Sequence, residues 1–390
     1  MYRQIAEGLK YIGVDDLDLD LFESQYEVPE GMVYNSYLIE DEKIAVLDTV
    51  DIRVERAWKD NLLAALGGRK PDYLVVHHLE PDHSGLIAWM VAEYPDIEVV
   101  ASAKALSFLG QFFEGFTGRT RAVKEGDELS LGTHSLRFVM APMVHWPEVM
   151  VSYDPTLKTV FSADAFGKFG ALGTCGFYGD EDTDWACEAR RYYFNICGKY
   201  GLPVQTLLKK LAAWDVARIC PLHGPILQSG LEEYLRLYQI WSSYGVESEG
   251  VFIAHASIHG GTAAAADCLA ELLEKRGVKV VVSDLCRCDM AEAVEDAFRY
   301  GKVVLAAASY DGGVFPPMFE FLHHLQDKAW QKRTVGLVEN GTWAPSAARV
   351  MCEQLSAMKD VTIVEPVVTL RSRMQGKDLP ALEALADALA

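Results

Sequence analysis

The final part of the sequence alternates apolar strands with helices, and this alternation restricts the chain to few folds. Segments such as TAAAADCLAELLEKRG and MAEAVEDAFRYG have the composition of helices and lie between apolar runs. Strand, helix and strand in repeated order predict a parallel, doubly wound sheet with helices on both faces. The five strands predicted in this part are 250–257, 278–285, 302–309, 333–340 and 361–368.

The residues before this alternation show shorter strands and tighter turns. Segment 31–50 predicts two strands joined by a charged turn, and 72–78 predicts a buried strand followed by an amphipathic helix at 84–95. These features predict a sheet-rich sandwich with helices outside. The change of pattern predicts two domains, at residues 1–247 and 248–390.

The charge of the chain narrows the range of its partners. Of its 390 residues, 36 are Lys or Arg and 56 are Asp or Glu, so the formal net charge is −20. A surface this acidic repels DNA, RNA and anionic lipid, which argues against nucleic-acid binding. The first residues lack the basic and apolar regions of a secretory signal, and no apolar run reaches ~18 residues. We therefore expect a cytoplasmic protein without a membrane segment.

The eight cysteines are scattered, and none forms a CxxC pair. This spacing argues against a rubredoxin-type iron site, a thioredoxin motif or a zinc ribbon. We expect reduced and mostly buried thiols.

The stretch VVHHLEPDHSG, residues 75–85, gathers groups that bind metals. Alternation along an extended segment directs His78, Glu80 and Asp82 to one side, and His83 follows directly. Imidazole with carboxylate suits zinc or iron, and several carboxylates without thiolate favour iron or manganese. A salt-bridged loop is the alternative, which four ligand-type residues within six positions disfavour. His77 is expected to point into the core or to support the ligands.

Three further candidates follow strands downstream and precede turns rich in glycine, proline or aromatic residues. Side chains at the ends of strands lie on a rigid scaffold, which suits metal ligands. Seven side chains exceed the needs of one tetrahedral ion, so two metals are indicated. The full candidate set is His78, Glu80, Asp82, His83, His145, Asp164 and His223.

A loop rich in small polar residues follows the first strand of the second part and opens a helix. Hydroxyls and free backbone N–H groups at the N-terminus of a helix form a phosphate cradle. The position after the first strand of a doubly wound sheet strengthens this interpretation. The residues of the predicted cradle are Ser257, Ile258, His259, Gly260, Gly261 and Thr262.

Two more loops follow the third and fourth predicted strands, where side chains could cover the two faces of a flavin ring. Three loops at neighbouring strand ends favour flavin mononucleotide (FMN) over the alternative that their aromatic residues are ordinary surface groups. The fingerprint GxGxxG is absent, which argues against direct binding of a dinucleotide. The predicted contacts are Ser309, Tyr310, Asp311, Gly312, Asn340, Gly341, Thr342 and Trp343.

The order HxExDH, then a distant His, an Asp and a final His, resembles the ligand order of the metallo-β-lactamase fold. The hydrolases of that fold usually carry HxHxDH and bind zinc. Glu80 in place of the second histidine, followed by a flavodoxin-like half, is similar to the flavodiiron proteins. This resemblance implies an N-terminal metallo-β-lactamase-like αββα sandwich and a C-terminal flavodoxin-like doubly wound sheet.

The resemblance also implies which residues hold which ion. His78, Glu80 and His145 would bind one iron, the set Asp82, His83 and His223 would bind the other, and Asp164 would bridge the two. In the flavin half, His259 replaces the hydroxyl residue that flavodoxins usually carry.

The resemblance implies an oxidoreductase that reduces O2 to water, or NO to N2O, at a non-haem di-iron site that FMN re-reduces. Electrons would come from an external donor such as rubredoxin, or from a deazaflavin. A head-to-tail homodimer is implied, with Trp343 at the contact between subunits. Trp146, Tyr192 and Tyr193 would line the gas pocket or pack in the core.

Two other functions remain open at this point. One is a metallo-β-lactamase-fold hydrolase with a regulatory flavodoxin domain, which would bind zinc. The other is an electron-transfer or redox-sensing flavoprotein whose metal site is vestigial. The spacing of residues does not reveal a preference between O2 and NO.

Overall fold

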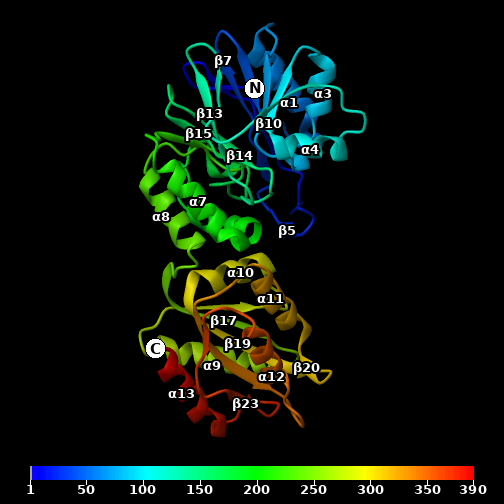
Figure 1. The fold of residues 1–390 in the computed structure, drawn as a ribbon. Helices are drawn as coiled ribbons and strands as arrows, with labels where there is room; N and C mark the ends of the chain where they lie inside the picture. The colour runs from blue at the N-terminus through cyan, green and yellow to red at the C-terminus, as the bar shows by residue number, and fades with distance from the viewer. Residues whose placement is uncertain (1) are drawn as a thin grey trace. The chain divides into compact units, whose positions relative to one another are not determined.

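The computed structural model describes residues 2–390, which form two compact units (Figure 1). The first unit comprises residues 2–193 and 202–239, and the second comprises residues 194–201 and 240–390. Two short helical turns lie where the chain first passes from one unit to the other, and they are η2 (Tyr193–Cys197) and η3 (Gly198–Tyr200). No helix within residues 2–390 has both the length and the apolar character needed to cross a membrane.

Two sheets form the centre of the first unit. The larger sheet has the order β1-β2-β7-β8-β9-β10-β11, with strands β1 (Arg3–Ala6), β2 (Leu9–Tyr11), β7 (Tyr37–Glu40), β8 (Ile44–Leu47), β9 (Tyr73–Val76), β10 (Glu98–Ser102) and β11 (Arg119–Val123). The smaller sheet has the order β12-β13-β14-β15-β16, with strands β12 (Glu128–Ser130), β13 (Ser135–Met140), β14 (Met150–Asp154), β15 (Thr159–Phe161) and β16 (Arg218–Cys220). Two short pairs are β3 (Val14–Asp16) with β6 (Met32–Tyr34), and β4 (Leu21–Phe22) with β5 (Tyr26–Glu27).

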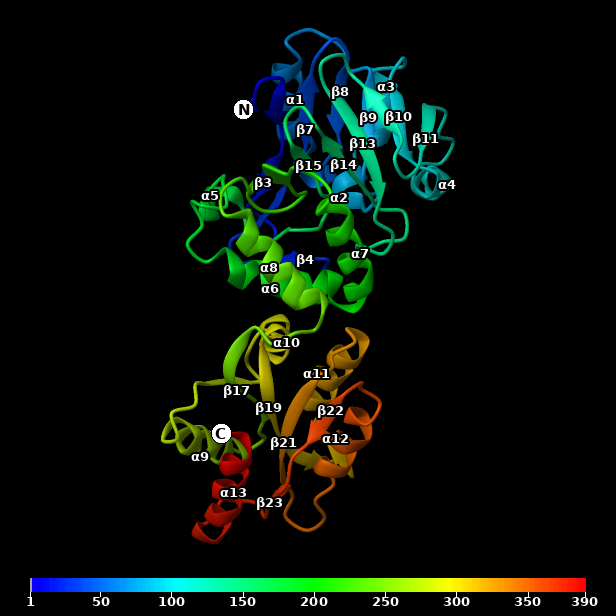
Figure 2. The same cartoon turned by 60° about the vertical axis from the view of Figure 1, so that its left-hand side comes forward.

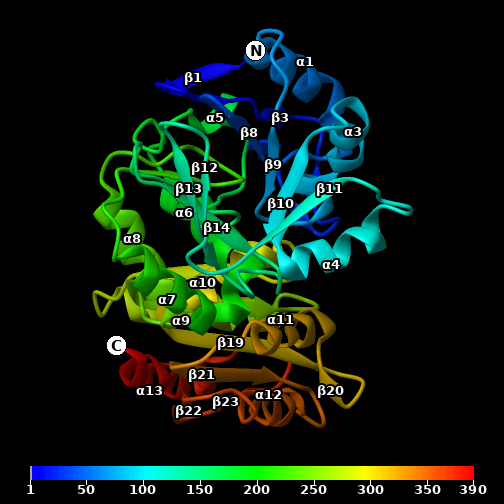
Figure 3. The ribbon, with the colours of Figure 1, turned by 45° about the horizontal axis from the view of Figure 1, so that its top comes forward.

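Helices cover the outside of this pair of sheets. Figure 3 shows α1, α3 and α4 beside the larger sheet, and α6, α7 and α8 on the opposite side of the sandwich. The helices of this unit and its 3-10 turn are η1 (Ile52–Val54), α1 (Glu55–Leu66), α2 (Pro81–Ser84), α3 (Ile87–Glu93), α4 (Ala103–Phe112), α5 (Leu172–Cys175), α6 (Trp185–Tyr192), α7 (Gly201–Leu211) and α8 (Leu231–Ser242).

The core of the first unit contains side chains from both sheets. Leu47 and Val75 come from the larger sheet, and Phe138, Met150 and Phe161 come from the smaller one; all are almost completely buried. Burial of a side chain of this size contributes ~1.5–3 kcal/mol. This packing fixes the strand ends, and therefore the loops that leave them.

A parallel sheet with helices on both faces forms the second unit. Its order is β18-β17-β19-β21-β22, with strands β17 (Ser248–Ala256), β18 (Val280–Asp284), β19 (Tyr300–Tyr310), β21 (Arg333–Asn340) and β22 (Val361–Ile363). These neighbours are all parallel, while β20 (Gly313–Val314) pairs antiparallel with β19 and β23 (Val368–Leu370) pairs parallel with β21.

Helices α9 and α13 lie on one side of this sheet and α11 and α12 on the other (Figure 2). Apolar residues of β17, β19 and β21 form a buried cluster with α9 and α13. The helices and the 3-10 turn are α9 (Gly261–Glu274), α10 (Met290–Arg299), α11 (Pro316–Asp327), α12 (Ala347–Leu355), η4 (Gly376–Asp378) and α13 (Leu379–Leu389).

The structure differs from the sequence prediction in two segments. The predicted strand 361–368 is divided into β22 and β23, because Pro366 has no N–H group to donate to a sheet. The helix expected at 84–95 is α3, which begins later at Ile87, and a separate helical turn, α2, precedes it with Pro81 in its first turn, where proline is favoured. Asp82 and His83 therefore lie on a helical turn, so the expected alternation stops at Glu80.

Candidate metal centre and phosphate cradle

The predicted ligands come together from the ends of four strands. His78 and Glu80 lie in the loop after β9, and Asp82 and His83 follow on α2. The other three follow β13, β15 and β16, and they are His145, Asp164 and His223. Six of the seven side chains are buried and Glu80 is half-buried. The core that fixes these strands therefore positions the site.

The ligand atoms form two groups. In each group, the atoms lie within 4.8 Å of one another: the first contains His78, Glu80, His145 and Asp164, and the second contains Asp82, His83 and His223. Glu80 Oε2 lies 3.1 Å from His78 Nε2 and 3.0 Å from His145 Nε2. Asp82 Oδ2 lies 3.4 Å from His83 Nε2 and 3.2 Å from His223 Nε2. Each group thus offers two imidazoles and its own carboxylate.

Asp164 lies between the two groups. Its Oδ2 is 3.0 Å from His145 Nε2 and 3.4 Å from His78 Nε2. Its Oδ1 is 3.1 Å from His83 Nε2 and 3.7 Å from His223 Nε2. One oxygen faces each group, which is the arrangement that a bridging carboxylate needs.

Several buried ligand atoms lack hydrogen-bond partners within residues 2–390. They are both carboxylate oxygens of Asp82, both ring nitrogens of His83, Nε2 of His223 and Oδ1 of Asp164. Buried polar atoms in proteins are almost always paired, so these atoms fit bound cations. Nitrogen and oxygen donors without thiolate suit iron, manganese or zinc. The residues present therefore fit two metal ions.

The electrostatics of the site favour cations. Burial lowers the pKa of His145, but hydrogen bonds to Asp164 and Glu80 outweigh it and raise that pKa to about 9. Burial would raise the pKa of Asp164, yet the charge of His83 and a hydrogen bond from His145 hold it well below its usual range. The Asp164 carboxylate therefore stays ionised and provides negative charge for a metal.

The sequence indicated that His77 lies outside the ligand set, and in the structure its ring nitrogens bond to other groups. Its Nδ1 donates to Asp48 Oδ2 at 2.6 Å, and the Ser152 hydroxyl donates to its Nε2 at 2.7 Å. The backbone N–H of His77 also donates to Asp48 Oδ1. This buried network holds the His77 ring in the core, away from the candidate ligand atoms.

The phosphate cradle lies at the start of α9. Gly260 has φ +81°, a left-handed conformation that glycine adopts readily, and Gly261 begins the helix. The buried hydroxyl oxygen of Ser257 has no hydrogen-bond partner within residues 2–390. The cradle therefore combines free backbone donors with an unpaired hydroxyl, which fits a phosphate.

The other two predicted loops lie at the ends of β19 and β21. Tyr310 is 46% exposed and Trp343 is 88% exposed, so both rings are free to cover a ligand. Ser309 Oγ accepts the backbone N–H of Ser346 at 2.8 Å, so this hydroxyl supports the loop itself.

Comparisons with known proteins agree with this geometry. The family model described as ODP family beta lactamase matches residues 32–224. A nitric oxide reductase of Moorella thermoacetica is 28% identical over 386 residues, which are 96% of this chain and 94% of that protein. Diflavin flavoprotein A 1 of Synechocystis is 32% identical over 307 residues, 77% of this chain and 52% of that protein. The chain thus spans about half the length of the diflavin flavoproteins that it matches.

Two solved structures share the whole architecture. Rubredoxin oxygen:oxidoreductase of Desulfovibrio gigas superposes with a TM-score of 0.93 at 24% identity, over 100% of this chain and 98% of that chain. The flavodiiron protein of Giardia intestinalis superposes with a TM-score of 0.93 at 22% identity, over 99% and 95%. The chain therefore has the fold of the flavodiiron proteins. The predicted metallo-β-lactamase-like sandwich and flavodoxin-like sheet are confirmed.

Aromatic rings surround the candidate metal ligands. The Trp146 ring lies 5.2 Å from that of His78, and the Tyr192 ring lies 5.6 Å from that of His223. Tyr193 is fully buried, and its ring packs edge-on against Tyr238 at 5.2 Å. Trp146 and Tyr192 thus contact the ligands, while Tyr193 belongs to the core.

Sequence reasoning missed side chains that reach the centre from β4 and its turn. The Phe22 ring lies 5.3 Å from that of His223. Desolvation and the negative charge of Glu80 raise the pKa of Glu23 to about 7. No ligand-type spacing marks these residues, because only the tertiary fold brings this hairpin to the site.

A fourth loop of the cradle was also missed. Asn340 Nδ2 donates to the Ser372 carbonyl at 2.7 Å, and the Ser372 N–H donates to Asn340 Oδ1 at 3.0 Å. The hydroxyls of Thr342 and Ser372 lie 2.7 Å apart. A Cβ at Gly261 would lie 2.3 Å from the Ser372 carbonyl oxygen, so the loop after β23 closes directly on the start of α9.

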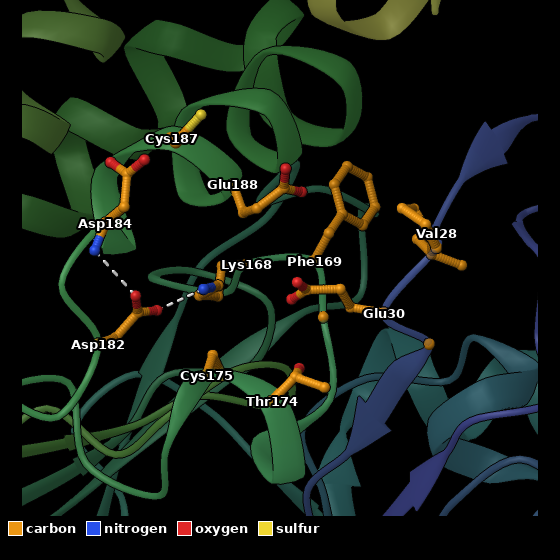
Figure 4. A pocket seen from close by; sticks show the side chains of 13 residues that line it. Val28, Glu30, Lys168, Phe169, Thr174, Cys175, Asp182, Asp184, Cys187 and Glu188 are labelled. Atoms are coloured by element: carbon orange, nitrogen blue, oxygen red, sulfur yellow. Dashed lines mark hydrogen bonds and ion pairs between the residues drawn. The ribbon is translucent and has the colours of Figure 1, made fainter.

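A cavity of about 320 Å³ in the first unit contains none of the predicted ligands (Figure 4). Lys168, four residues after Asp164, points toward Asp182 in this cavity and forms an ion pair with it. The carboxylates of Glu30 and Glu188 also line the cavity. The paired lysine leaves the lining acidic.

Proposed function

We propose that this chain is an oxidoreductase that reduces O2 to water, or NO to N2O, at a non-haem di-iron site supplied with electrons by FMN. The observation that carries the proposal is the pair of ligand groups that share Asp164. The names of two similar proteins, the nitric oxide reductase of Moorella thermoacetica and the rubredoxin oxygen:oxidoreductase of Desulfovibrio gigas, support these reactions.

The seven ligands divide between two iron positions. His78, Glu80 and His145 hold the first iron in this proposal, and Asp164 bridges to the second. The second position consists of Asp82, His83 and His223. When bound, the two irons supply electrons and open positions for a diatomic gas.

The chain's own residues define what surrounds the gas. Carboxylates from Glu80, Asp82 and Asp164 neutralise the cations, and the rings of Trp146 and Tyr192 cover the ligands. These rings restrict water near the metals, which strengthens electrostatic interactions there.

FMN is proposed to bind at the carboxyl edge of the second unit's sheet. Its phosphate would accept hydrogen bonds from Ser257 and the backbone at Gly260 and Gly261. Tyr310 and Trp343 would cover the ring, and Asn340 and the Ser372 loop would brace the cradle. The remaining predicted contacts, which stay proposals, are Ile258, His259, Thr262, Ser309, Asp311, Gly312, Gly341 and Thr342.

Electrons are proposed to arrive from a separate donor such as rubredoxin, which the name of the Desulfovibrio protein supports. A head-to-tail homodimer is proposed, with Trp343, which is 88% exposed and therefore accessible, at the subunit contact. A cytoplasmic location is proposed; the eight free cysteines support a reducing compartment.

Metal and flavin analysis of the purified protein tests this proposal against a hydrolase. The proposal predicts about two irons and one FMN per chain, without esterase or lactonase activity. Zinc together with cleavage of ester or lactam bonds would support a hydrolase with a regulatory flavodoxin domain. FMN without iron would support a flavoprotein with a vestigial metal site.

A further inference from the structure

The imidazoles of the two metal positions differ in what lies behind the ring. His78 turns Nε2 toward Glu80, and its Nδ1 donates to Glu148 Oε1 at 2.7 Å. His223 turns Nε2 toward Asp82, and its Nδ1 donates to the carbonyl of Val33 at 2.7 Å. One imidazole is therefore backed by a carboxylate and the other by a neutral carbonyl. Within residues 2–390, Nδ1 of His83 has no partner at all.

The hydrogen bonds of the Glu148 carboxylate go to the His78 ring and to the adjacent backbone. The Glu148 side chain is fully buried, and Oε1 also accepts the backbone N–H of Leu79 at 3.0 Å. Its Oε2 has no hydrogen-bond partner within residues 2–390. A buried carboxylate without a cation of its own is costly, so its charge needs a positive group nearby. A metal on the far side of the His78 ring supplies that charge.

A carboxylate behind an imidazole makes the ring a stronger donor. Accepting the Nδ1 proton increases electron density at Nε2, which strengthens the bond to the metal. A backbone carbonyl carries no net charge and does this less. The first position also faces Glu80 and one oxygen of Asp164, while the second faces Asp82 and the other oxygen. Glu148 therefore places a negative charge in direct contact with an imidazole of the first position, which His223 of the second position lacks.

We propose that Glu148 makes the two metal positions unequal. The iron held by His78, Glu80 and His145 is bound more tightly, and its ferric state is more favoured, than the iron held by Asp82, His83 and His223. Glu148 is a positioning residue that acts through His78. The inference rests on the proposed di-iron function. It adds that the first position binds iron before the second and that its iron is oxidised more readily.

Stepwise loading of the metal-free wild-type protein with ⁵⁷Fe(II), followed by Mössbauer spectroscopy, tests the inequality. The first equivalent is expected to give a single quadrupole doublet, and the second equivalent is expected to add a doublet with different parameters. Two doublets that grow together from the first addition would overturn the inference while leaving a di-iron protein. A protein that binds no iron would refute the proposed function itself.

Glu148→Gln assigns the inequality to this residue. The amide keeps the shape and can still accept from His78 and Leu79, but it removes the charge. The affinity for the first iron is expected to fall about 10–100-fold, and only the first doublet is expected to shift. A change of both doublets together would indicate a merely structural role and would contradict the proposal, as would unchanged affinity.

Ser152→Ala is the matched control. The substitution removes the buried hydrogen bond that the Ser152 hydroxyl donates to His77, the neighbour of His78. It leaves Glu148 in place. It is expected to lower the melting temperature without changing either doublet. If the Glu148 variant does not fold, the wild-type titration can still overturn the inference, because it shows whether the two positions are unequal.

Discussion

The candidate metal centre is made of buried charged side chains, whereas the phosphate cradle is made of backbone turns and exposed rings. Asp164 is 1% exposed, while Trp343 is 88% exposed. Within residues 2–390, the carboxylate oxygens of Asp82 and Nε2 of His223 have no hydrogen-bond partner, whereas most residues of the cradle are exposed or half-buried. The first unit therefore depends on its metals for stability, while the second unit is expected to fold without its flavin.

The largest expected effect is the loss of both irons on Asp164→Ala. Asp164 faces both ligand groups, so its removal leaves each group one carboxylate short. Activity is expected to fall by more than ~100-fold, because the loss of groups that only support a ligand already costs 10–100-fold. Iron analysis should show the loss, and the FMN content should stay unchanged. Loss of iron from one position alone would contradict the bridging role.

Removal of the metals by a chelator should affect the two units unequally. Ligands bound at 1,000 times their Kd stabilise a fold by ~4.1 kcal/mol, which corresponds to about 10 °C in a domain of this size. Differential scanning calorimetry should show this fall in the transition of the first unit. Equal shifts of all transitions would contradict the separation of the two units' stabilities.

Gly261→Ala tests the cradle without touching the metals. The new Cβ would lie 2.3 Å from the Ser372 carbonyl, so the fourth loop must move away from the start of α9. Strain of this kind costs about 1–3 kcal/mol, which corresponds to a loss of about 5–150-fold in FMN affinity. Flavin fluorescence titration measures it.

Gly376→Ala is the control for this substitution, because a Cβ at that position meets no atom within 4 Å. It should leave FMN affinity unchanged. Iron content should be the same in both glycine variants. Unchanged FMN affinity in Gly261→Ala would remove the Ser372 loop from the cradle.

The smallest expected effect is the change in stability on removal of a surface carboxylate, Glu40, in contrast to the buried carboxylates of the metal centre. A hydrogen bond from Lys10 holds the pKa of Glu40 below its ordinary 4.5. The lowered pKa stabilises the fold above pH 4.5, and this contribution is lost as the pH falls through the folded-state pKa. Because Glu40 is partly exposed and screened by solvent, Glu40→Gln should cost less than ~1 kcal/mol at pH 7. Urea unfolding should show the two proteins converging at acid pH.

The sequence could place the candidate metal ligands in one cluster because each one follows a strand, and the sandwich core brings the strand ends together. It could also place three candidate loops at one edge of the second sheet, because parallel strands end at the same edge of a sheet. The alternating order of strands and helices was sufficient to predict the doubly wound sheet. These predictions share one basis: the relevant residues lie at fixed places relative to regular elements.

The residues that were missed act across long distances in the sequence. Glu148 lies 70 residues from His78, and its proximity depends on the packing of two sheets. Ser372 was missed because the last predicted strand is interrupted at Pro366, which moves the following loop to the cradle. Asp82 and His83 were placed on an extended segment, but Pro81 starts a helical turn there. Local pattern carries no information about these long-range contacts.

Anaerobic stopped-flow of the pre-reduced protein, mixed separately with O2 and with NO, tests the di-iron claim most directly. The account predicts rapid consumption of at least one gas, coupled to reoxidation of the flavin, and loss of this phase in Asp164→Ala. Equal rates of flavin reoxidation in wild type and Asp164→Ala, with both gases, would contradict it.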